Sequence, residues 1–168
     1  MPKVSKKTDK LKEYKEHRDL KYSTEPSGKS KSKKLKHPIY VVQEHHATHL
    51  HYDLRLEFGG VLKSWAIPKG IPIEHGEKRL AVPTDDHPLD YATFQGVIPE
   101  GHYGAGTVII WDFGTYQNLK SKDMQECYDE GKIEIFIDGE KIQGNYALIR
   151  TKLIKGNKYN WIILKMKN

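Results

Sequence analysis

The clearest pattern in the chain is a strict alternation of apolar and polar side chains from residue 49 to residue 58. One parity holds only apolar residues: Leu50, Tyr52, Leu54, Leu56 and Phe58. The other parity holds only ionisable residues: His49, His51, Asp53, Arg55 and Glu57. Because successive side chains of a strand point to opposite faces, the pattern predicts a strand with one apolar face and one face of ionisable groups. An ordinary solvated face is rich in Lys, Glu, Ser and Thr, so this face is the first candidate for a functional surface.

The rest of the chain is predicted to be a series of short strands separated by turns. Gly59-Gly60 is a tight two-residue turn, after which residues 61–67 are expected to pair back as a hairpin. Further strands are expected at residues 39–44, 78–83, 106–113, 132–138, 144–151 and 159–166, and short helices at 11–20 and 121–130. Many short strands with little room for crossover helices predict a mainly β protein, built as an antiparallel barrel or a sandwich.

The positive charge of the chain is concentrated in an N-terminal arm. The net charge is +6, and residues 1–36 hold thirteen Lys or Arg against five Asp or Glu, whereas the remainder holds fifteen against seventeen. Residues 1–10 are expected to be a disordered basic tail, 29–36 a basic linker, and 11–168 a single domain. The arm is either a solvated tail that aids solubility or an electrostatic tether for nucleic acid, and composition alone favours neither.

Composition excludes several classes of protein. No apolar run approaches the roughly 20 residues that span a bilayer, and the N-terminal residues lack the apolar stretch of a secretory signal. Cys127 is the only cysteine, which rules out an internal disulfide and a thiolate metal cluster. A reducing, cytoplasmic location is therefore expected, and Cys127 itself is expected to be incidental to function.

The ionisable face also offers a set of metal ligands. His51 and Asp53 lie two residues apart on one strand face, and His45 enters from the preceding turn. Two imidazoles and one carboxylate suit a divalent transition metal and leave open positions for water or substrate. This nitrogen and oxygen set fits manganese or zinc and does not choose between them. The alternative is that hydrogen bonds satisfy these histidines, but their spacing on one parity favours a metal.

Arg55 and His87 are candidates for binding a phosphate. The Arg55 guanidinium can bind two phosphate oxygens at once, and its alternative role is a salt bridge to Glu57. Pro88 disfavours helical geometry at His87, which suits a loop that presents the imidazole at a strand end as a proton donor. Tyr91 can add a hydroxyl donor.

Two neighbouring segments carry weaker signals. Taken alone, residues 85–91 read as a turn. The glycine-rich residues 96–106 match neither phosphate-binding fingerprint, and they are interpreted as a tight bend that leads into a strand.

Three ordered blocks carry a resemblance to a known family. The blocks are His45-x5-His51-Tyr52-Asp53-x-Arg55-Leu56-Glu57, the Leu62–Gly70 segment LKSWAIPKG, and Asp86-His87-Pro88-Leu89-Asp90-Tyr91 continuing through residues 96–107. Together they resemble the 3′-phosphoesterase module of bacterial DNA ligase D, over about residues 11–166. Since no polymerase or ligase domain is attached, the chain looks like the free-standing form of this module.

The resemblance implies a manganese-dependent β-barrel enzyme of about eight strands, a size that suits a closed barrel. Such an enzyme trims 3′ ends of DNA in double-strand-break repair by non-homologous end joining. It removes a 3′-terminal ribonucleoside by phosphodiester cleavage and then the exposed 3′-phosphate by monoester hydrolysis. The implied substrate is DNA, or a primer–template that carries either end, and the implied partners are a separate ligase or polymerase. Zinc or cobalt are alternatives to manganese, and no membrane is involved.

The resemblance also assigns roles to individual positions. His45, His51 and Asp53 look like the metal ligands, and Arg55, His87 and Tyr91 look like the groups that contact the scissile phosphate. Further family positions near the substrate are matched by Gln43, Lys69, Arg18, Asp19, Glu25 and Asp85. Asp85 stands where the family usually has Glu. The N-terminal matches imply that residues 11–36 fold over the active site.

Two other functions remain open from the sequence. One is a non-catalytic module that binds DNA ends and recruits a ligase or polymerase, and the other is a zinc hydrolase of small phosphate esters. The basic arm favours nucleic acid over small esters, and the ligand set favours an enzyme over a pure binding module. Attack by water and attack through a covalent histidine intermediate are both compatible with these residues.

Overall fold

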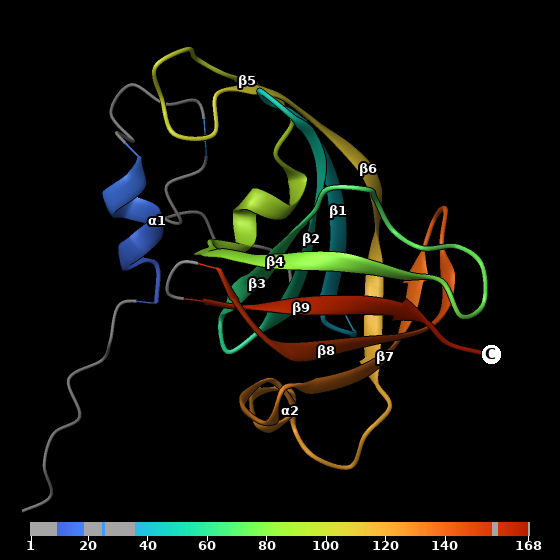
Figure 1. Ribbon diagram of the computed structural model, residues 1–168. Coiled ribbons are helices and arrows are strands. Elements are labelled where there is room, and N and C mark those ends of the chain that lie inside the picture. Colours follow the sequence, from blue (N-terminus) through green and yellow to red (C-terminus); the bar gives the residue numbers. More distant parts are fainter. Residues whose placement is uncertain (1–9, 19–24, 26–35, 156–157, 168) are drawn as a thin grey trace, which may run out of the picture.

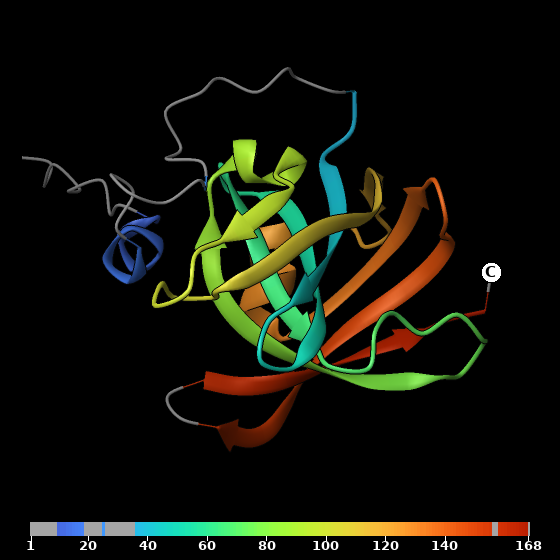
Figure 2. The ribbon, with the colours of Figure 1, turned by 90° about the horizontal axis from the view of Figure 1, so that it is seen from above.

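The protein folds as a closed antiparallel β-barrel (Figures 1 and 2). The structure is a computed structural model that describes residues 10–18, 25, 36–155 and 158–167. Its strands are β1 (Ile39–His46), β2 (Leu50–Phe58), β3 (Val61–Ile67), β4 (Lys78–His87), β5 (Gly96–Ile98), β6 (Gly106–Asn118), β7 (Lys132–Gly139), β8 (Gln143–Lys155) and β9 (Lys158–Lys165). The helices are α1 (Lys12–His17), the 3₁₀ helix η1 (Leu89–Thr93) and α2 (Met124–Glu130).

Eight of the strands form the barrel, and β1 closes it. The pairing runs β1-β2-β3-β4-β9-β8-β7-β6, and β6 pairs back with β1 along the whole of β1 and most of β6. The short strand β5 pairs with the start of β6 and lies outside this circuit. Every pairing is antiparallel.

The main hydrophobic core fills the barrel interior, because it draws side chains from all eight barrel strands. Leu54 and Leu56 of β2 lie in it, as does Trp65 of β3, whose ring centroid is 5.6 Å from that of Trp161 in β9. Helix α2 adds Met124 and Cys127 to the same core. The single cysteine is therefore a packing residue.

A second apolar cluster lies on the opposite side of the strand wall. It joins Val41 of β1 and Leu62 of β3 to Tyr91 of η1, Ile98 of β5 and Tyr14 of α1. In Figure 1 these covering segments lie beside the barrel, with α1 next to β4, while η1 contacts β1 and β3. Both faces of β1 and β2 are thus covered, and the ionisable face of β2 lies beneath the second layer.

The predicted fold class is confirmed, and the barrel is the form it takes rather than a sandwich. Residues 85–91 were expected to form a turn. Instead, β4 continues as far as His87, and η1 begins at Leu89. The expected helix at 121–130 begins only at Met124, because the Asp123 side chain caps it by accepting a 2.8 Å hydrogen bond from the Glu126 amide. A helix was expected at residues 11–20, and the helix observed there is the shorter α1 (Lys12–His17).

The tail expected at residues 1–10 and the linker at 29–36 lie almost wholly outside the described residues. Lys10 is described, and its ammonium donates a 2.6 Å hydrogen bond to the Gly59 carbonyl in the β2–β3 turn. Among the described residues, no helix has the length and hydropathy needed to cross a membrane.

A glycine at the start of β6 is predicted to be essential for barrel closure. Gly106 has a φ of +137°, and a Cβ there would meet the His46 carbonyl oxygen of β1 at 2.2 Å. The Gly106→Ala variant should lose about 3 kcal/mol of unfolding free energy, because both strain and a backbone clash are introduced. Urea denaturation measures this loss.

Gly60 provides the matched control for that variant. Its φ is +80°, but a Cβ there would meet nothing within 4 Å. The Gly60→Ala variant should therefore lose only about 1 kcal/mol, from backbone conformation alone. Equal losses in the two variants would contradict a steric role for Gly106 at the seam.

Candidate active site

The ionisable face of β2 forms the floor of a pocket of about 290 Å³. The wall strands β1, β2 and β4 supply most of its polar lining, and the loop before β6 and the end of α1 cover it. The most buried polar groups that line the pocket are His45, Asp53, Arg55, Asp85 and His87, each less than 8% exposed. A pocket floored by buried ionisable groups is the expected setting for chemistry or ion binding.

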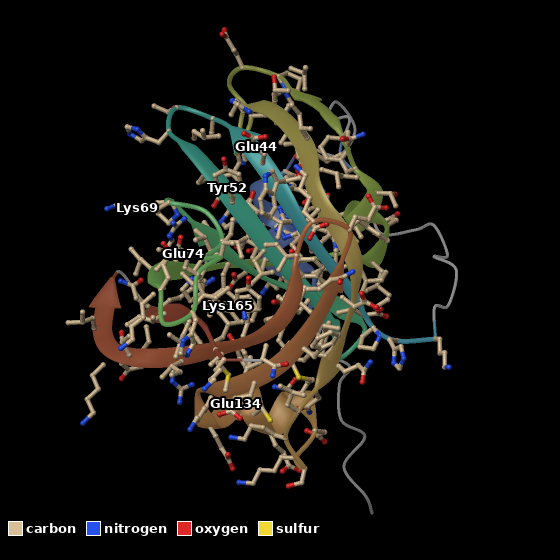
Figure 3. All side chains as sticks on the ribbon, turned by 90° about the vertical axis from the view of Figure 1, so that its right-hand side faces the viewer. Glu44, Tyr52, Lys69, Glu74, Glu134 and Lys165 are labelled. Atoms are coloured by element: carbon tan, nitrogen blue, oxygen red, sulfur yellow. The ribbon has the colours of Figure 1, made fainter. Side chains whose placement is uncertain are left out.

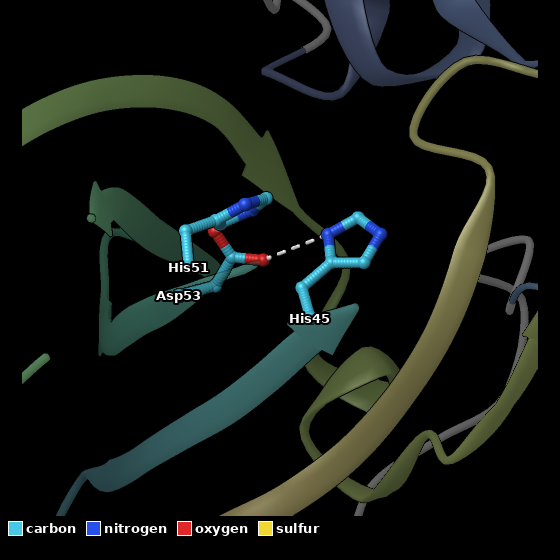
Figure 4. Close-up of side chains that lie close together, drawn as sticks. All are labelled: His45, His51 and Asp53. Atoms are coloured by element: carbon cyan, nitrogen blue, oxygen red, sulfur yellow. Dashed lines mark ion pairs between the residues drawn. The ribbon is translucent and has the colours of Figure 1, made fainter. Parts of the chain in front are cut away.

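Three of these side chains converge at one end of the pocket. His45 and His51 are directly opposite each other in the β1–β2 pairing, which places their ring centroids 4.7 Å apart. Asp53 is the next residue on this face of β2. Its carboxylate oxygens lie 3.4 Å from His45 Nδ1 and 3.3 Å from His51 Nε2 (Figure 4). The predicted set of three metal ligands is therefore brought together.

The hydrogen bond on the far side of each histidine ring determines which ring nitrogen carries the proton. The other nitrogen of each ring faces Asp53. His45 Nε2 lies 2.7 Å from the Gly104 carbonyl oxygen, and His51 Nδ1 lies 3.1 Å from the His49 carbonyl oxygen. Since a carbonyl only accepts, both of these nitrogens donate a proton. In the neutral imidazoles the remaining nitrogens are lone-pair acceptors, and both of them point at a carboxylate.

Three acceptors that face one another repel unless a cation lies between them, and that cation is either a proton on one of the rings or a metal ion. The possible ligand atoms of His45, His51 and Asp53 all lie within 4.8 Å of one another. Carbonyl groups behind metal-binding histidines are also the usual means of orienting such rings. The residues present therefore fit a divalent metal with mixed nitrogen and oxygen ligands.

The charges around Asp53 keep its carboxyl ionised. Burial alone would raise its pKa, but the Arg55 guanidinium and the contacts with the rings of His45 and His51 hold the pKa well below its usual range. Burial is the largest single influence on His51 and lowers its pKa, but the contacts with Asp53 and with the His49 carbonyl together leave the pKa raised. A carboxylate that stays charged in a buried position is suited to holding a cation.

Arg55 lies beside the ligand set and is held rigidly. Its Nε donates a 2.6 Å hydrogen bond to Gln43 Oε1, and one terminal nitrogen lies 3.4 Å from Asp53. The Gln43 amide nitrogen donates in turn to the carbonyl oxygens of Tyr91 (2.8 Å) and Phe94 (3.1 Å). Gln43 is fully buried and acts here by fixing the guanidinium. The alternative salt bridge to Glu57 does not form, since Glu57 accepts from the Ile39 amide instead.

A bulge in β4 turns His87 towards Arg55. The pairing of β3 with β4 shifts by one residue between Ser64, which is opposite Thr84, and Leu62, which is opposite His87. Simple alternation from Ala81, which lies in the interior core, would point His87 into the barrel. The extra residue reverses this direction, as bulges beside functional sites commonly do. His87 is thus the last residue of a strand and is only 3% exposed, not on a loop as expected.

His87 lies between two guanidinium groups. Arg18 and Arg55 each place a terminal nitrogen 3.2 Å from one of its ring nitrogens. Burial, followed by these two cations, lowers the pKa of His87 well below its usual value. Its Nδ1 lies 2.7 Å from the Asp85 carbonyl oxygen, so Nδ1 donates there and Nε2 accepts from Arg18.

The end of α1 and Glu25 add a second set of buried charges. Arg18 Nε donates to Glu25 at 2.9 Å, one terminal nitrogen lies 3.5 Å from Asp85, and the guanidinium packs 4.2 Å from the Tyr14 ring centroid. The Tyr91 hydroxyl donates to Glu25 at 2.8 Å. The hydroxyl expected to contact phosphate is therefore directed at a carboxylate, and the Tyr91 ring packs beneath Arg55 at 4.8 Å.

The net charge of the pocket changes sign if a divalent cation binds. With neutral imidazoles, the cluster holds two guanidinium cations and three carboxylates, which belong to Arg18, Arg55, Asp53, Asp85 and Glu25. A divalent cation would make this net negative cluster positive. An anionic substrate would then be attracted rather than repelled.

Three of the predicted substrate residues do not line the pocket. Gln43 and Glu25 lie behind it, hydrogen-bonded to Arg55 and Arg18, and the third is Lys69. Lys69 lies in the turn after β3, its side chain points away from the barrel in Figure 3, and it is not part of the pocket lining. Its backbone carbonyl accepts a hydrogen bond from Arg79. Asp19 lies outside the described residues.

The glycine-rich segment before β6 contributes more than the expected tight bend. Its Gly104 carbonyl orients His45, and its Tyr103 ring stacks on His17 with centroids 4.6 Å apart. His17 also pairs with Asp85. The only sequence signal for this role was the density of glycines, since Gly104 has a φ of +76°.

Comparisons with known proteins agree with this geometry. Residues 43–150 match the sequence model of the DNA ligase D 3′-phosphoesterase domain. The chain is 48% identical over 159 residues to the multifunctional non-homologous end joining protein LigD of Pseudomonas aeruginosa, covering 94% of the chain and 19% of that protein. It is 46% identical over 164 residues to the protein of the same name from Mycolicibacterium smegmatis, covering 95% and 21%.

A third relative is the multifunctional non-homologous end joining DNA repair protein LigD of Mycobacterium tuberculosis. It is 45% identical over 160 residues, covering 95% of the chain and 20% of that protein. The chain thus spans about a fifth of the length of these relatives. The matched segment contains all three candidate metal ligands together with Arg55, His87 and Tyr91. The chain belongs to the DNA ligase D 3′-phosphoesterase domain family.

Proposed function

We propose that the chain is a manganese-dependent phosphoesterase that processes 3′ ends of DNA during double-strand-break repair by non-homologous end joining. It removes a 3′-terminal ribonucleoside by phosphodiester cleavage and then the remaining 3′-phosphate by monoester hydrolysis. The observation that carries this proposal is the arrangement of His45, His51 and Asp53, whose acceptor atoms face one another beside two buried guanidinium groups. The names of the relatives, which refer to end joining, support the cellular role.

The proposed metal would be held by His45 Nδ1, His51 Nε2 and the Asp53 carboxylate. A bound divalent ion would supply Lewis-acid polarisation of a phosphoryl oxygen and orient water. The choice of manganese over zinc or cobalt comes from the family resemblance, because the ligand set suits all three.

Arg55 is proposed to bind the non-bridging oxygens of the scissile phosphate. Its guanidinium is already desolvated and fixed by Gln43, so little reorganisation accompanies charge development in the transition state. Arg18 lines the pocket from the opposite side of His87 and would bind the same phosphate, with Glu25 and Asp85 holding it in place. In this proposal Tyr91 acts through its contacts with Arg55 and Glu25, and its hydroxyl reaches phosphate only by leaving Glu25.

His87 is proposed to donate a proton or hydrogen bond to the leaving oxygen. Burial and the two guanidinium cations keep its pKa low in the ligand-free site. A phosphate anion bound to Arg18 and Arg55 would offset those charges and favour the protonated ring. The donor would therefore form only when substrate is present.

The central experiment compares two histidine variants on DNA. Wild-type protein and manganese are incubated with a primer–template that ends in a 3′-ribonucleotide or in a 3′-phosphate. Wild type should convert both ends, and His45→Ala should lose activity by about a hundredfold or more, because one of three ligands is gone. His75→Ala is the matched control, since His75 is exposed in the β3–β4 connection and outside the pocket.

Manganese titration by calorimetry, combined with assays of DNA binding and of small-ester hydrolysis, separates the three candidate functions. Binding to wild type and His75→Ala, but not to His45→Ala, is expected. Tight DNA binding with neither metal binding nor conversion would identify the non-catalytic end-binding module. Rapid hydrolysis of small phosphate esters with zinc, and none of DNA, would identify the small-ester hydrolase.

Replacement of His87 should reduce turnover without removing the metal. The His87→Asn variant keeps a polar side chain but loses the ring proton, so kcat/KM on the 3′-phosphate end should fall by about a hundredfold. Its manganese affinity should match that of wild type, because His87 is not among the grouped ligands. Unchanged kcat/KM would remove His87 from the proposed mechanism.

Gln43 should prove to be a positioning residue. The near-isosteric Gln43→Leu leaves the Arg55 Nε and two backbone carbonyls without their present partners, each costing about 1–3 kcal/mol if unpaired. A lower melting temperature and a fall in kcat of about tenfold are expected, with manganese affinity retained. A rise in KM alone would instead indicate direct substrate contact.

A further inference from the structure

A second and larger pocket lies alongside the candidate active site. It has a volume of about 550 Å³ and is bounded by α1, β3, β4, α2 and the paired strands β8 and β9. Figure 1 shows α1 beside the adjacent ends of β4 and β9, and residues of these three elements line the pocket. We call this pocket the basic groove. Neither the metal ligands nor the proposed catalytic residues line it.

The basic groove carries a clear excess of positive charge. Five cationic side chains line it, against two carboxylates. The cations are Lys10, Lys12, Lys63, Arg150 and Lys158. Lys12 and Lys158 retain 74% and 45% exposure, and their partners Glu16 and Glu13 are also largely exposed. Exposed ion pairs of this kind contribute little, so phosphate oxygens could replace the carboxylates at small cost.

Aromatic rings lie between these cations. The Arg150 guanidinium lies 6.0 Å from the Tyr159 ring centroid and 5.9 Å from that of Trp161. Tyr159 remains 47% exposed, which leaves part of its side chain accessible to a ligand. Cations interleaved with an exposed aromatic ring are typical of surfaces that bind a nucleic-acid strand, which offers both phosphates and flat bases.

The bulge in β4 joins the basic groove to the active site. Thr84 lines both pockets, while Asp85 lines only the active site and Asp86 only the groove. The Thr84 hydroxyl is buried and has no hydrogen-bond partner among the described residues. Helix α1 also spans the two, since Lys12 and Glu13 border the groove and Arg18 follows the helix into the active site.

We propose that the basic groove binds the nucleic-acid strand that leads to the reactive 3′ end. Phosphates of that strand would contact Lys12, Lys158 and Arg150, and a base would stack on Tyr159. This inference rests on the proposed function, since it extends the same substrate beyond its terminal nucleotide. The groove would give the enzyme affinity for a polymer, while the active-site pocket binds only the end.

Charge reversal inside and outside the basic groove tests this proposal. The Lys12→Glu/Arg150→Glu double variant is compared with Lys78→Glu/Lys141→Glu, whose exposed lysines line neither the groove nor the active-site pocket. Fluorescence anisotropy in the presence of manganese measures binding to DNA of about 12 nucleotides, a length typical of strand-binding sites, which carries a non-hydrolysable phosphonate in place of the 3′-phosphate. A dinucleotide with the same 3′-phosphonate is measured by competition as the short ligand. Tyr159→Ala serves as a second, uncharged variant.

The groove double variant should bind the long DNA about tenfold more weakly than the control double variant, with the dinucleotide affinities of the two alike. Its slope of log affinity against log salt should be smaller by about one for each lost phosphate contact. Tyr159→Ala should also weaken long DNA about tenfold, within the range for loss of one stacked base, and leave the salt slope unchanged.

Equal losses in the groove and control double variants would overturn the proposal, because net charge alone would then explain them. An equal loss for long DNA and dinucleotide would also overturn it, since displacement of α1 from the active site would be the cause. If wild type binds long DNA through the groove but converts neither 3′ end, the proposed function fails and the groove assignment stands.

Discussion

Strand β1 is paired along both of its edges, and the barrel and the site both depend on this double pairing. Its pairing with β6 closes the barrel, and its pairing with β2 sets His45 opposite His51. The same register puts Gln43 opposite Asp53, two residue pairs further along and on the same face, and therefore within reach of Arg55. Barrel closure and the placement of the candidate ligands thus depend on the backbone hydrogen bonds along the two edges of one strand.

The site is built from charges that are costly to bury one by one. Asp53, Arg55, Arg18 and Glu25 are all nearly inaccessible to solvent, and each of them has a charged partner within 3.5 Å. Removing one member leaves another charge buried and uncompensated, which is usually far more destabilising than removing both. The same pairing fixes each group before substrate arrives, so the arrangement that carries the stability penalty also supplies preorganisation.

Much of this organisation could be predicted from the sequence, because it follows from alternation. Period-two patterning identified β2, and parity placed His51, Asp53 and Arg55 on one face. The residues around Pro88 indicated His87, and family resemblance added Arg18, which no periodicity could connect to His87, since 69 positions separate them. Short-range rules therefore fix the strands, whereas the contacts between distant segments need the fold.

Other features depend on backbone details that composition does not encode. The Gly104 carbonyl orients His45 only because a loop far along the chain returns to β1. Gln43 was expected near the substrate, but its side-chain amide is hydrogen-bonded to Arg55 and to two backbone carbonyls. Lys69 was expected there as well, and it lies outside the pocket because its turn ends on another part of the barrel.

The single extra residue in β4 makes chain length as important to this site as chemistry. It lets Asp85 and His87 face the active site while Ala81, earlier in the same strand, faces the interior core. Deleting one residue at the bulge would remove no metal ligand and little apolar surface. It would nevertheless rotate His87 into the barrel and sever the continuity between the basic groove and the pocket. The geometry of this site therefore depends on the number of residues in β4 as well as on their identity.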